Sequence, residues 1–341
     1  MPELRRDPLV GRWVVFSPER KQRPQDFKSS GILPGPIESF LWGNEHLTPP
    51  EVYSARVPGT PANSPGWQVR VVPNRFPALR IEGDLDPEGA GLYDRMNGIG
   101  AHEVVIETPD PAVALEDQPL EGVAEVLRAY RSRINDLSRD SRFRSVLIFK
   151  NVGQLAGATL RHAHSQIVAL PVVPKVLDDR LTAARAYYKE KERSLFEDIL
   201  RAEQKEGTRL VYENAGFAAF CPYASRFPFE LLIVPKRQNP HFQQSSDHEL
   251  ALAADTLKQT LQRLSKGLRH PDYNLILHTA PLGKPRDNGD SSDHAFRWHI
   301  EILPRLSGIA GFEFGTGFFI NSTLPEEAAQ FLRSVRLKPQ A

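Results

Sequence analysis

The sequence contains a single cysteine, Cys221, among its 341 residues. One thiol excludes both a disulfide framework within the chain and a zinc site built mainly from cysteines. So few thiols are typical of a reducing compartment, and we expect a cytoplasmic protein. The N-terminal residues, MPELRRDPLVGRW, also lack the apolar core of a signal peptide.

Long apolar runs and an excess of either charge are missing as well. No run of 18 apolar residues is available to span a membrane. The 43 lysines and arginines nearly balance the 42 aspartates and glutamates. Because nucleic acids are bound mainly through basic surfaces, we expect neither a nucleic-acid partner nor a membrane partner. A small anionic substrate held by a few arginines remains compatible with this composition.

Proline is abundant, with 29 residues, and its clustering before residue 66 predicts strands and irregular loops in the first third. Apolar residues at helical spacing predict a helix between Val123 and Leu137 and a charged helical connector over 176–206. Two more helices should begin near Ser246, in a Ser-x-x-Glu capping box, and near Thr323. Runs rich in β-branched residues predict strands at 11–16, 68–72, 102–107, 145–150, 165–170, 209–213, 217–221, 229–234, 273–278 and 297–303.

An internal repeat organises these elements. The tetrapeptide NRFP at 74–77 is echoed by SRFP at 225–228, and each is followed by a strand, a helix, a strand and a strand with a histidine. The last strands, HAHSQIVALP and RWHIEILPRL, pair His164 with His299, Gln166 with Glu301, and His162 with Arg297. We therefore expect a duplicated α+β unit, with units at 1–175 and 207–341 and the connector at 176–206.

The HAHSQ segment is the first candidate site. Alternate side chains of a strand share a face, so His162, His164 and Gln166 should point to one side and leave a polar face for water or a ligand. They are either structural histidines, part of a metal site, or a nucleophile with its supporting groups. A metal would need further ligands, and the sequence does not place the candidates Glu38, His46 and His102.

The nucleophile interpretation needs a neutral imidazole held in one tautomer. Gln166 would donate to a phosphoryl oxygen. The glycine-containing turn from Gly153 to Thr159 would add backbone N–H groups and a hydroxyl, since glycine allows close approach of the main chain to phosphate. This arrangement favours attack on phosphorus through a phosphorus–nitrogen intermediate.

The pattern Asn151-x-Gly…Ala-Gly-Ala-Thr-Leu…His162-Ala-His164-Ser-Gln166 resembles the galactose-1-phosphate uridylyltransferase family, a branch of the histidine-triad superfamily. That family usually has His-Pro-His-x-Gln, with the second histidine as nucleophile. The resemblance covers nearly the whole chain and implies two tandem histidine-triad-like units. Five further segments resemble motifs of the family and occur in the same order as they do there. They are LRRDPLVGRWVVFSPERKQRP, VVPNRFPAL, ASRFPFELLIVPKR, RWHIEILPRL and GFEFGTGFFINSTLPEEAA.

The resemblance implies ping-pong nucleotidyl transfer. His164 would take UMP from UDP-glucose, release glucose 1-phosphate and pass UMP to galactose 1-phosphate or another hexose 1-phosphate. Gln166 would hold the phosphoryl oxygen, and the backbone around His162 would orient His164. The family is a homodimer in which the segment near 311–321 helps complete the partner's hexose site. Residues implied to bind substrate are Arg20, Arg23, Asn74, Arg75, Asn151, Gly157, Ala158, Thr159, Gly315, Gly317 and Asn321.

The metal sites of the family are only partly present in this sequence. Many members bind a structural zinc through two cysteines and two histidines, but of these only His162 remains, with Glu38, Leu41 and Pro111 at the other positions. We therefore expect no cofactor there. A second site for zinc or iron is left open, because three candidate ligands are present while Arg180 takes the place of the fourth; these candidates are His278, His299 and Glu301.

The segment implied to bind the nucleotide departs from the usual family motif. Arg75 replaces an acidic residue of the family's uridine-binding segment, and this change can favour adenine. ADP-glucose phosphorylases, which share the fold and pass AMP to phosphate, are therefore the main alternative. A non-catalytic nucleotide-binding protein is a second. Related phosphoramidate and dinucleotide hydrolases usually carry a histidine at the position of Gln166, so Gln166 favours transfer to a phosphate acceptor over hydrolysis.

Overall fold

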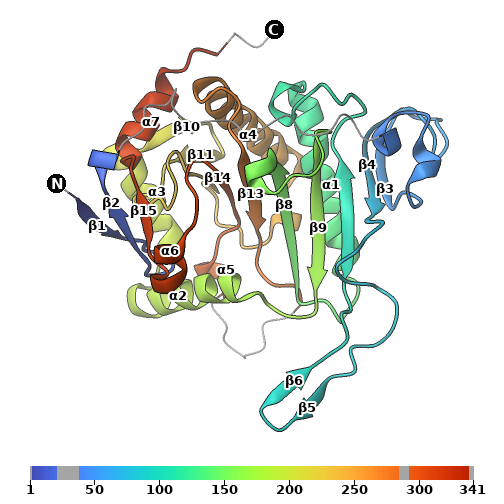
Figure 1. Ribbon diagram of the computed structural model, residues 1–341, viewed down its shortest axis with the longest axis horizontal. Coiled ribbons are helices and arrows are strands. Elements are labelled where there is room, and N and C mark those ends of the chain that lie inside the picture. The colour runs from blue at the N-terminus through green and yellow to red at the C-terminus, as the bar shows by residue number, and fades with distance from the viewer. Residues whose placement is uncertain (1, 21–37, 284–291, 338–341) are drawn as a thin grey trace.

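A single antiparallel sheet of ten strands forms the centre of the protein (Figure 1). The computed structural model describes residues 2–20, 38–283 and 292–337. In order across the sheet, the strands are β10 (Leu210–Glu213), β11 (Phe217–Phe220), β12 (Leu231–Pro235), β14 (His299–Pro304), β13 (Tyr273–His278), β8 (Ser145–Val152), β9 (His164–Leu170), β7 (Ala101–Ile106), β4 (Trp67–Pro73) and β3 (Tyr53–Arg56).

The sheet consists of two equivalent halves, each of five strands, joined where β8 pairs with β13. In the first half Phe149 lies opposite Gln166, and in the second Ile276 lies opposite Glu301. Phe149 and Ile276 therefore hold equivalent positions, and they also lie opposite each other at the junction. A local twofold axis passes between them. This arrangement confirms the duplicated α+β unit and the predicted pairing of Gln166 with Glu301.

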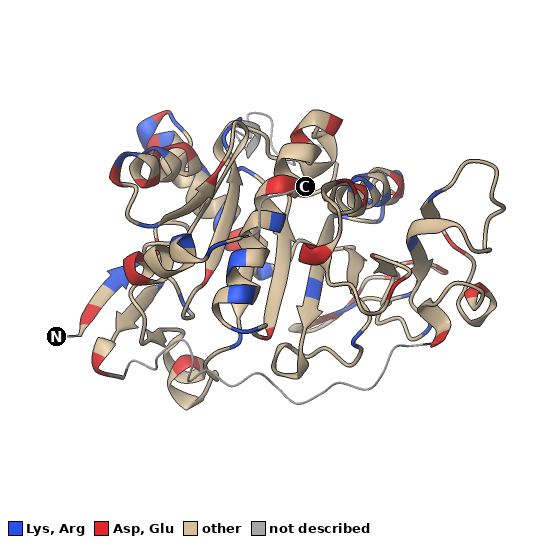
Figure 2. Cartoon of the chain, turned by 90° about the horizontal axis from the view of Figure 1, so that it is seen from above, with Lys and Arg blue, Asp and Glu red and all other residues tan. Residues whose placement is uncertain are grey.

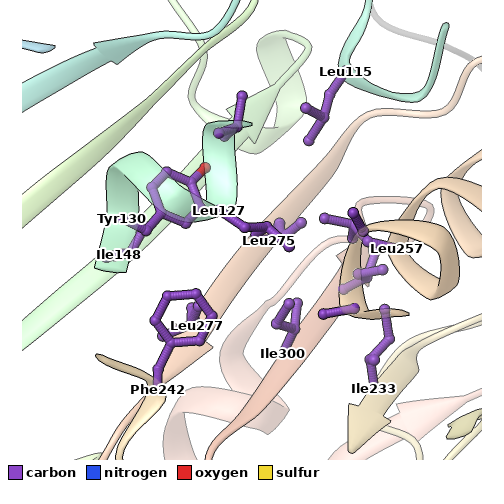
Figure 3. Close-up of a cluster of buried hydrophobic side chains, with 14 of the residues drawn as sticks. Leu115, Leu127, Tyr130, Ile148, Ile233, Phe242, Leu257, Leu275, Leu277 and Ile300 are labelled. Atoms are coloured by element: carbon purple, nitrogen blue, oxygen red, sulfur yellow. The ribbon is translucent and has the colours of Figure 1, made fainter. Parts of the chain in front are cut away.

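Two long helices cover one face of the sheet, α1 (Leu120–Leu137) and α4 (Asp247–Gly267). They pack against each other and against both halves. Figure 3 shows Leu127 of α1 and Leu257 of α4 beside Leu275 and Ile300 of the sheet. Burial of these apolar side chains, together with the pairing of β8 with β13, joins the two halves. The predicted capping box of Ser246 is present at the start of α4.

The other face is covered over the second half by α2 (Lys175–Lys191) and α3 (Leu195–Glu206). Leu177 and Phe196 of these helices pack on Val234 in β12. The connector at 176–206 was predicted as one helical stretch, but Glu192 adopts a left-handed conformation with φ of 54° and ends α2. Over the first half the same face carries a smaller apolar cluster of Phe40, Trp67, Val72, Val104 and Ile106.

A small second sheet joins the two ends of the chain. It contains β1 (Glu3–Arg6), β2 (Trp13–Phe16) and β15 (Phe319–Asn321), with β15 parallel to β2. The last helix, α7 (Pro325–Ser334), begins just after the predicted start near Thr323, because Leu324 precedes a proline and is extended. A hairpin of β5 (Glu88–Ala90) and β6 (Tyr93–Arg95) projects from the body of the protein in Figure 1. The remaining short elements are the helices α5 (Ser292–Ala295) and α6 (Gly311–Thr316) and the 3-10 helices η1 (Pro18–Arg20), η3 (Glu38–Phe40), η4 (Glu45–Leu47), η5 (Leu115–Asp117), η6 (Gln154–Ala156) and η7 (Phe242–Gln244).

The charged residues are mixed in sign. Figure 2 shows basic and acidic residues interspersed along the helices and strands. Within the described parts of the chain, no helix has both the length and the apolar character needed to cross a bilayer.

Candidate active site

His164 is the first residue of β9, and its side chain lies on the face of the sheet opposite α1 and α4. The imidazole is 7% exposed, and its Nδ1 lies 2.7 Å from the carbonyl oxygen of His162. Because a carbonyl oxygen can only accept, Nδ1 carries the proton and donates it. The lone pair on Nε2 is left available, which is the arrangement required of a nucleophilic histidine.

Burial also keeps His164 neutral. It lowers the pKa of the imidazole below its ordinary value, and the nearby Lys150 ammonium adds to the effect. His162 supplies the orienting carbonyl, and its own Nε2 donates to the carbonyl oxygen of Thr108 at 2.6 Å. The Phe40 ring meets both imidazoles edge-on. The two histidines are therefore unequal: within the described parts of the chain, His164 donates from Nδ1 and leaves Nε2 free, whereas His162 donates from Nε2 and has a fully buried Nδ1 without a hydrogen-bond partner.

Polar groups on the face of the sheet that α1 and α4 cover form hydrogen bonds to β9. The Lys150 ammonium donates to the carbonyl oxygen of His164 at 3.1 Å and to the Glu107 carboxylate at 2.7 Å. The Tyr130 hydroxyl donates to Ser165 at 2.7 Å. All of these groups are buried, so removing one partner would leave a costly unpaired charge or dipole. Sequence reasoning missed Lys150 and Glu107, although a charged residue at the end of an apolar strand is a signal for such a pair.

Gln166 lies two residues beyond His164 on the same face and is half-buried. Its Oε1 lies 2.7 Å from Nε2 of His102, a histidine of β7. Sequence reasoning named His102 only as a metal candidate that it could not place. The structure instead puts it beside Gln166.

The turn after β8 is tight because of Gly153, which has φ of 83°. A Cβ on Gly153 would lie 2.1 Å from the Asp272 side chain, which accepts the Leu155 N–H at 2.7 Å. The N–H groups of Ala156 and Ala158 donate to the Gly153 carbonyl, and that of Gly157 donates to Gln154. The N–H groups of residues 155–158 are therefore bonded within the protein, and a role of this turn in binding phosphate stays a prediction.

Asn151, Gly157 and Thr159 remain grouped around this turn. The side-chain oxygen of Asn151 accepts from Asn274 at 2.9 Å, and its nitrogen lies 3.9 Å from a Cβ position on Gly157. Gly157 and Thr159 are exposed, whereas Ala158 is buried. A cavity of about 620 Å³ adjoins the turn, where β8 ends and β9 begins. Its walls include Asn151, Gly153, His162, His164, Arg161 and, on the helix side, Glu116 and Tyr273.

The predicted nucleotide segment lies beside His102, since the Asn74 N–H donates to the His102 carbonyl oxygen at 2.8 Å. Asn74 is half-buried, and its side-chain oxygen accepts the Phe76 N–H at 2.9 Å. Arg75 is exposed, with its guanidinium 5.8 Å from the centre of the Phe76 ring. Arg20 is the last residue of η1, and Arg23 lies outside the described residues.

The C-terminal candidates are not brought to His164 within one chain. Gly315 and Gly317 are exposed at the end of α6, so their role toward a partner chain stays a prediction. Asn321 is fully buried in the small sheet. Its nitrogen donates to Ser225 at 2.9 Å and its oxygen accepts from Thr323 at 2.9 Å. Both ends of this amide are therefore bonded inside the fold, and a contact of Asn321 with substrate stays a prediction.

The second repeat contains an equivalent histidine, His299, whose two ring nitrogens both have hydrogen-bond partners. His299 donates from Nδ1 to the carbonyl of Arg297 at 2.9 Å, as His164 does to His162. Its Nε2, however, accepts from the guanidinium of Arg180. The lone pair that is free on His164 is therefore occupied on His299, and the second repeat holds no equivalent nucleophile.

Arg180 also occupies the place where the second metal site of the family would lie. Arg180 also donates to Glu301 at 2.6 Å, and Glu301 is bonded to Arg226 at 3.0 Å and to His278 at 2.8 Å. A guanidinium cation thus sits among the candidate ligands, and these residues do not fit zinc or iron. The zinc site of the first repeat does not fit either, because Leu41 and Pro111 offer no donor and Glu38 is exposed. In the described ranges no cluster of three His, Cys, Asp or Glu side chains suits a metal.

Because His278 is buried, we expect the protein to lose stability in acid. Burial, together with Arg180, lowers the pKa of His278 to about 4, below the value near 6.5 expected in the unfolded chain. Between these two values the unfolded state binds more protons, so the free energy of unfolding should fall as the pH falls. His278 alone should contribute a loss of about 3 kcal/mol between pH 6.5 and pH 4. Urea unfolding at a series of pH values measures this change.

A His278→Gln variant provides the control for this acid effect. Glutamine can still donate to Glu301 but does not titrate, so its stability should fall less steeply over the same pH range. Equal pH dependence in the variant and the unchanged protein would contradict the assignment to His278.

Comparison with known proteins agrees with this geometry. Family models described as the N-terminal and C-terminal domains of galactose-1-phosphate uridyl transferase match residues 1–174 and 180–337. The chain belongs to the galactose-1-phosphate uridylyltransferase family. Its nucleotidylyltransferase character and its tandem α+β fold are thereby established.

Relatives in this family differ in activity. The ADP-glucose phosphorylase of Arabidopsis thaliana is 38% identical over 98% of this chain and 93% of its own length. A crystal structure of an ADP-glucose phosphorylase from the same plant, with bound ADP-glucose, superposes with a TM-score of 0.82 at 35% identity, covering 99% of this chain and 100% of that one. The galactose-1-phosphate uridylyltransferase of Thermotoga maritima is 30% identical over 99% of this chain and 100% of its own length.

Proposed function

We propose that this protein transfers a nucleoside monophosphate from a nucleotide sugar to a phosphate acceptor through a covalent intermediate on His164. The observation that carries the proposal is the free Nε2 lone pair of a neutral, buried His164 whose Nδ1 proton is bound by the His162 carbonyl. This nitrogen belongs to a residue that lines the cavity beside Asn151 and the Gly153 turn. Gln166 lies on the same face as a donor for the phosphoryl oxygens.

The reaction proceeds in two displacements at the same phosphorus atom. In the first, Nε2 of His164 attacks the α-phosphorus, the P–N bond forms, and the bond to the sugar phosphate oxygen breaks. The sugar 1-phosphate leaves with the electron pair of that bond. In the second, an acceptor phosphate oxygen attacks the α-phosphorus and the P–N bond breaks, which returns the electron pair to His164. Both steps depend on positioning and on stabilising charge on the phosphoryl oxygens.

For the donor we propose ADP-glucose, with inorganic phosphate as acceptor and ADP and glucose 1-phosphate as products. Three observations support this choice over UDP-glucose. The Arabidopsis ADP-glucose phosphorylase is more similar to this chain than the Thermotoga uridylyltransferase is, at 38% against 30% identity. A structure that binds ADP-glucose superposes over the full chain. Finally, Arg75 stands where the uridylyltransferase motif has an acidic residue.

Uridylyl transfer from UDP-glucose to galactose 1-phosphate is the second candidate, since the family models and the Thermotoga relative carry that name. The two candidates use the same residues for chemistry. They differ in the nucleotide that is accepted at the segment of Asn74 and Arg75, and in the acceptor.

Product analysis with paired donors and acceptors tests the proposal. ADP-glucose with phosphate should give ADP and glucose 1-phosphate at a kcat/KM at least about 10-fold above that for UDP-glucose with galactose 1-phosphate, as expected for one lost polar contact to the wrong base. Without acceptor, labelled glucose 1-phosphate should exchange into ADP-glucose, because the first displacement is reversible.

Other products would identify the alternatives. Faster formation of UDP-galactose would favour the uridylyltransferase, and release of free AMP as the main product would indicate a hydrolase. No turnover and no exchange with either donor would indicate a non-catalytic nucleotide-binding protein.

A further inference from the structure

We propose that His102 is a positioning residue that fixes the orientation of the Gln166 side-chain amide. This inference rests on the proposed function, in which Gln166 donates to a phosphoryl oxygen. His102 lies in β7, the strand beside β9, on the same face as Gln166 and half-buried. It contacts Gln166 through one ring nitrogen and the segment after Asn74 through the other.

The hydrogen-bond partners determine the tautomer of His102. The backbone N–H of Ala78 lies 3.1 Å from Nδ1, and a backbone N–H can only donate. Nδ1 must therefore accept, which places the proton of the neutral ring on Nε2. That proton is donated to the side-chain oxygen of Gln166, 2.7 Å away. The Asn74 side-chain nitrogen also lies 3.1 Å from Nε2, but both nitrogens carry hydrogens in this tautomer and the contact is not a hydrogen bond.

The consequence for Gln166 concerns which end of its amide is free. The two ends of a glutamine amide are nearly equal in shape but opposite in hydrogen-bonding character. With its oxygen held by His102, Gln166 keeps its NH₂ group for another partner on the face that also carries His164. Without His102 the amide can rotate and present its oxygen, which repels a phosphoryl oxygen. His102 thus selects the donor orientation before substrate arrives.

The second repeat has a related connection at the position equivalent to His102, made by charged residues. Val104 pairs with Gln166 in the first half, and Leu232 pairs with Glu301 in the second, so Glu230 takes the position of His102. The Glu230 carboxylate accepts the backbone N–H of Phe227 at 3.2 Å. Arg226 then bridges Glu230 to Glu301, at 2.8 and 3.0 Å. In both halves this position thus contacts the segment of the NRFP or SRFP tetrapeptide or the residue after it, and is linked to Gln166 directly or to Glu301 through Arg226. The repeat therefore has a related connection in each half.

Two substitutions separate the two contacts of His102. His102→Asn places an oxygen near the position of Nδ1, where it accepts from Ala78, but does not reach Gln166. His102→Gln extends its NH₂ to the position of Nε2 and can still donate to Gln166. We expect His102→Asn to slow single-turnover formation of the nucleotidyl–His164 adduct from ADP-glucose by about 10-fold or more, a typical effect of misorienting one catalytic group. His102→Gln should stay within about 3-fold of the unchanged protein.

A second measurement separates positioning from folding. In a Gln166→Ala background, His102→Asn should add less than about 2-fold, since the two residues act as a unit. His248→Ala, at an exposed histidine of α4, is the matched control for histidine loss and should leave the rate unchanged. Thermal unfolding of each variant shows whether the fold is retained.

The outcomes distinguish the inference from the function on which it rests. If His102→Asn forms adduct as fast as the unchanged protein, or if its effect multiplies fully with that of Gln166→Ala, His102 does not act through Gln166 and the inference is overturned. If the unchanged protein forms no adduct with ADP-glucose or UDP-glucose, the proposed function fails, and the inference fails with it.

Discussion

Replacing His164 with alanine should abolish the covalent intermediate and lower turnover by a factor on the order of 10⁶, as loss of a catalytic nucleophile does in other enzymes. The physical reason is that neither neighbouring histidine can take the place of its Nε2. His162 uses Nε2 to donate to Thr108, and its Nδ1 is fully buried. His102 holds its proton on Nε2 and accepts on Nδ1. Steady-state kinetics with the best donor and acceptor pair measures the loss.

His46→Ala is the control for this substitution, because His46 is exposed in η4 and contacts none of these groups. It should leave turnover unchanged. Turnover of His164→Ala above about 1% of the unchanged protein would show that the chemistry does not pass through His164.

Replacing Arg180 with methionine should lower the free energy of unfolding by about 3–5 kcal/mol, the cost of breaking a buried ion pair from one side. Arg180 is 3% exposed and bonds Glu301 at 2.6 Å and the Nε2 of His299. The Arg180 and Arg226 guanidinium groups hold the pKa of Glu301 well below its usual range. Without Arg180 the buried carboxylate keeps only Arg226 and His278 as partners. Urea unfolding at neutral pH measures the change.

Lys189→Met provides a matched control on the same helix, since Lys189 is exposed near the end of α2. Surface substitutions of this kind change stability by less than about 0.5 kcal/mol. A value for Arg180→Met within about 1 kcal/mol of the unchanged protein would contradict the structural role assigned to Arg180.

Much of the framework could be predicted from local sequence. Residues 273–278 form β13 as predicted, and the capping box of Ser246 begins α4 as predicted. These features depend on neighbouring residues, through β-branched enrichment and side-chain capping. The duplication was also visible, because two copies of the same strand–helix–strand order can be compared directly. Local rules failed at Glu192, where a left-handed residue divides a charged, weakly patterned stretch into α2 and α3.

The candidate site was only partly predictable, because its chemistry depends on residues far apart in the chain. His164 and Gln166 are neighbours and were found together, but the partner of Gln166 is His102, 64 residues earlier. Arg180 and His299 are separated by 119 residues. Nothing in the local pattern of either shows that they touch. Asn321 shows the same limit, since the sequence did not reveal that its side chain is bonded at both ends inside the fold.

The central claim is a covalent nucleotidyl intermediate on His164, and mass spectrometry of the intact protein tests it most directly. The protein is incubated with ADP-glucose or with UDP-glucose in the absence of acceptor, and the modified peptide is then mapped. We predict a mass gain of one AMP residue, on His164, that disappears when phosphate is added and is missing from His164→Ala. A gain of one UMP residue on His164 would keep the intermediate and change the nucleotide. No gain with either donor, or a gain that persists in His164→Ala, would contradict the claim.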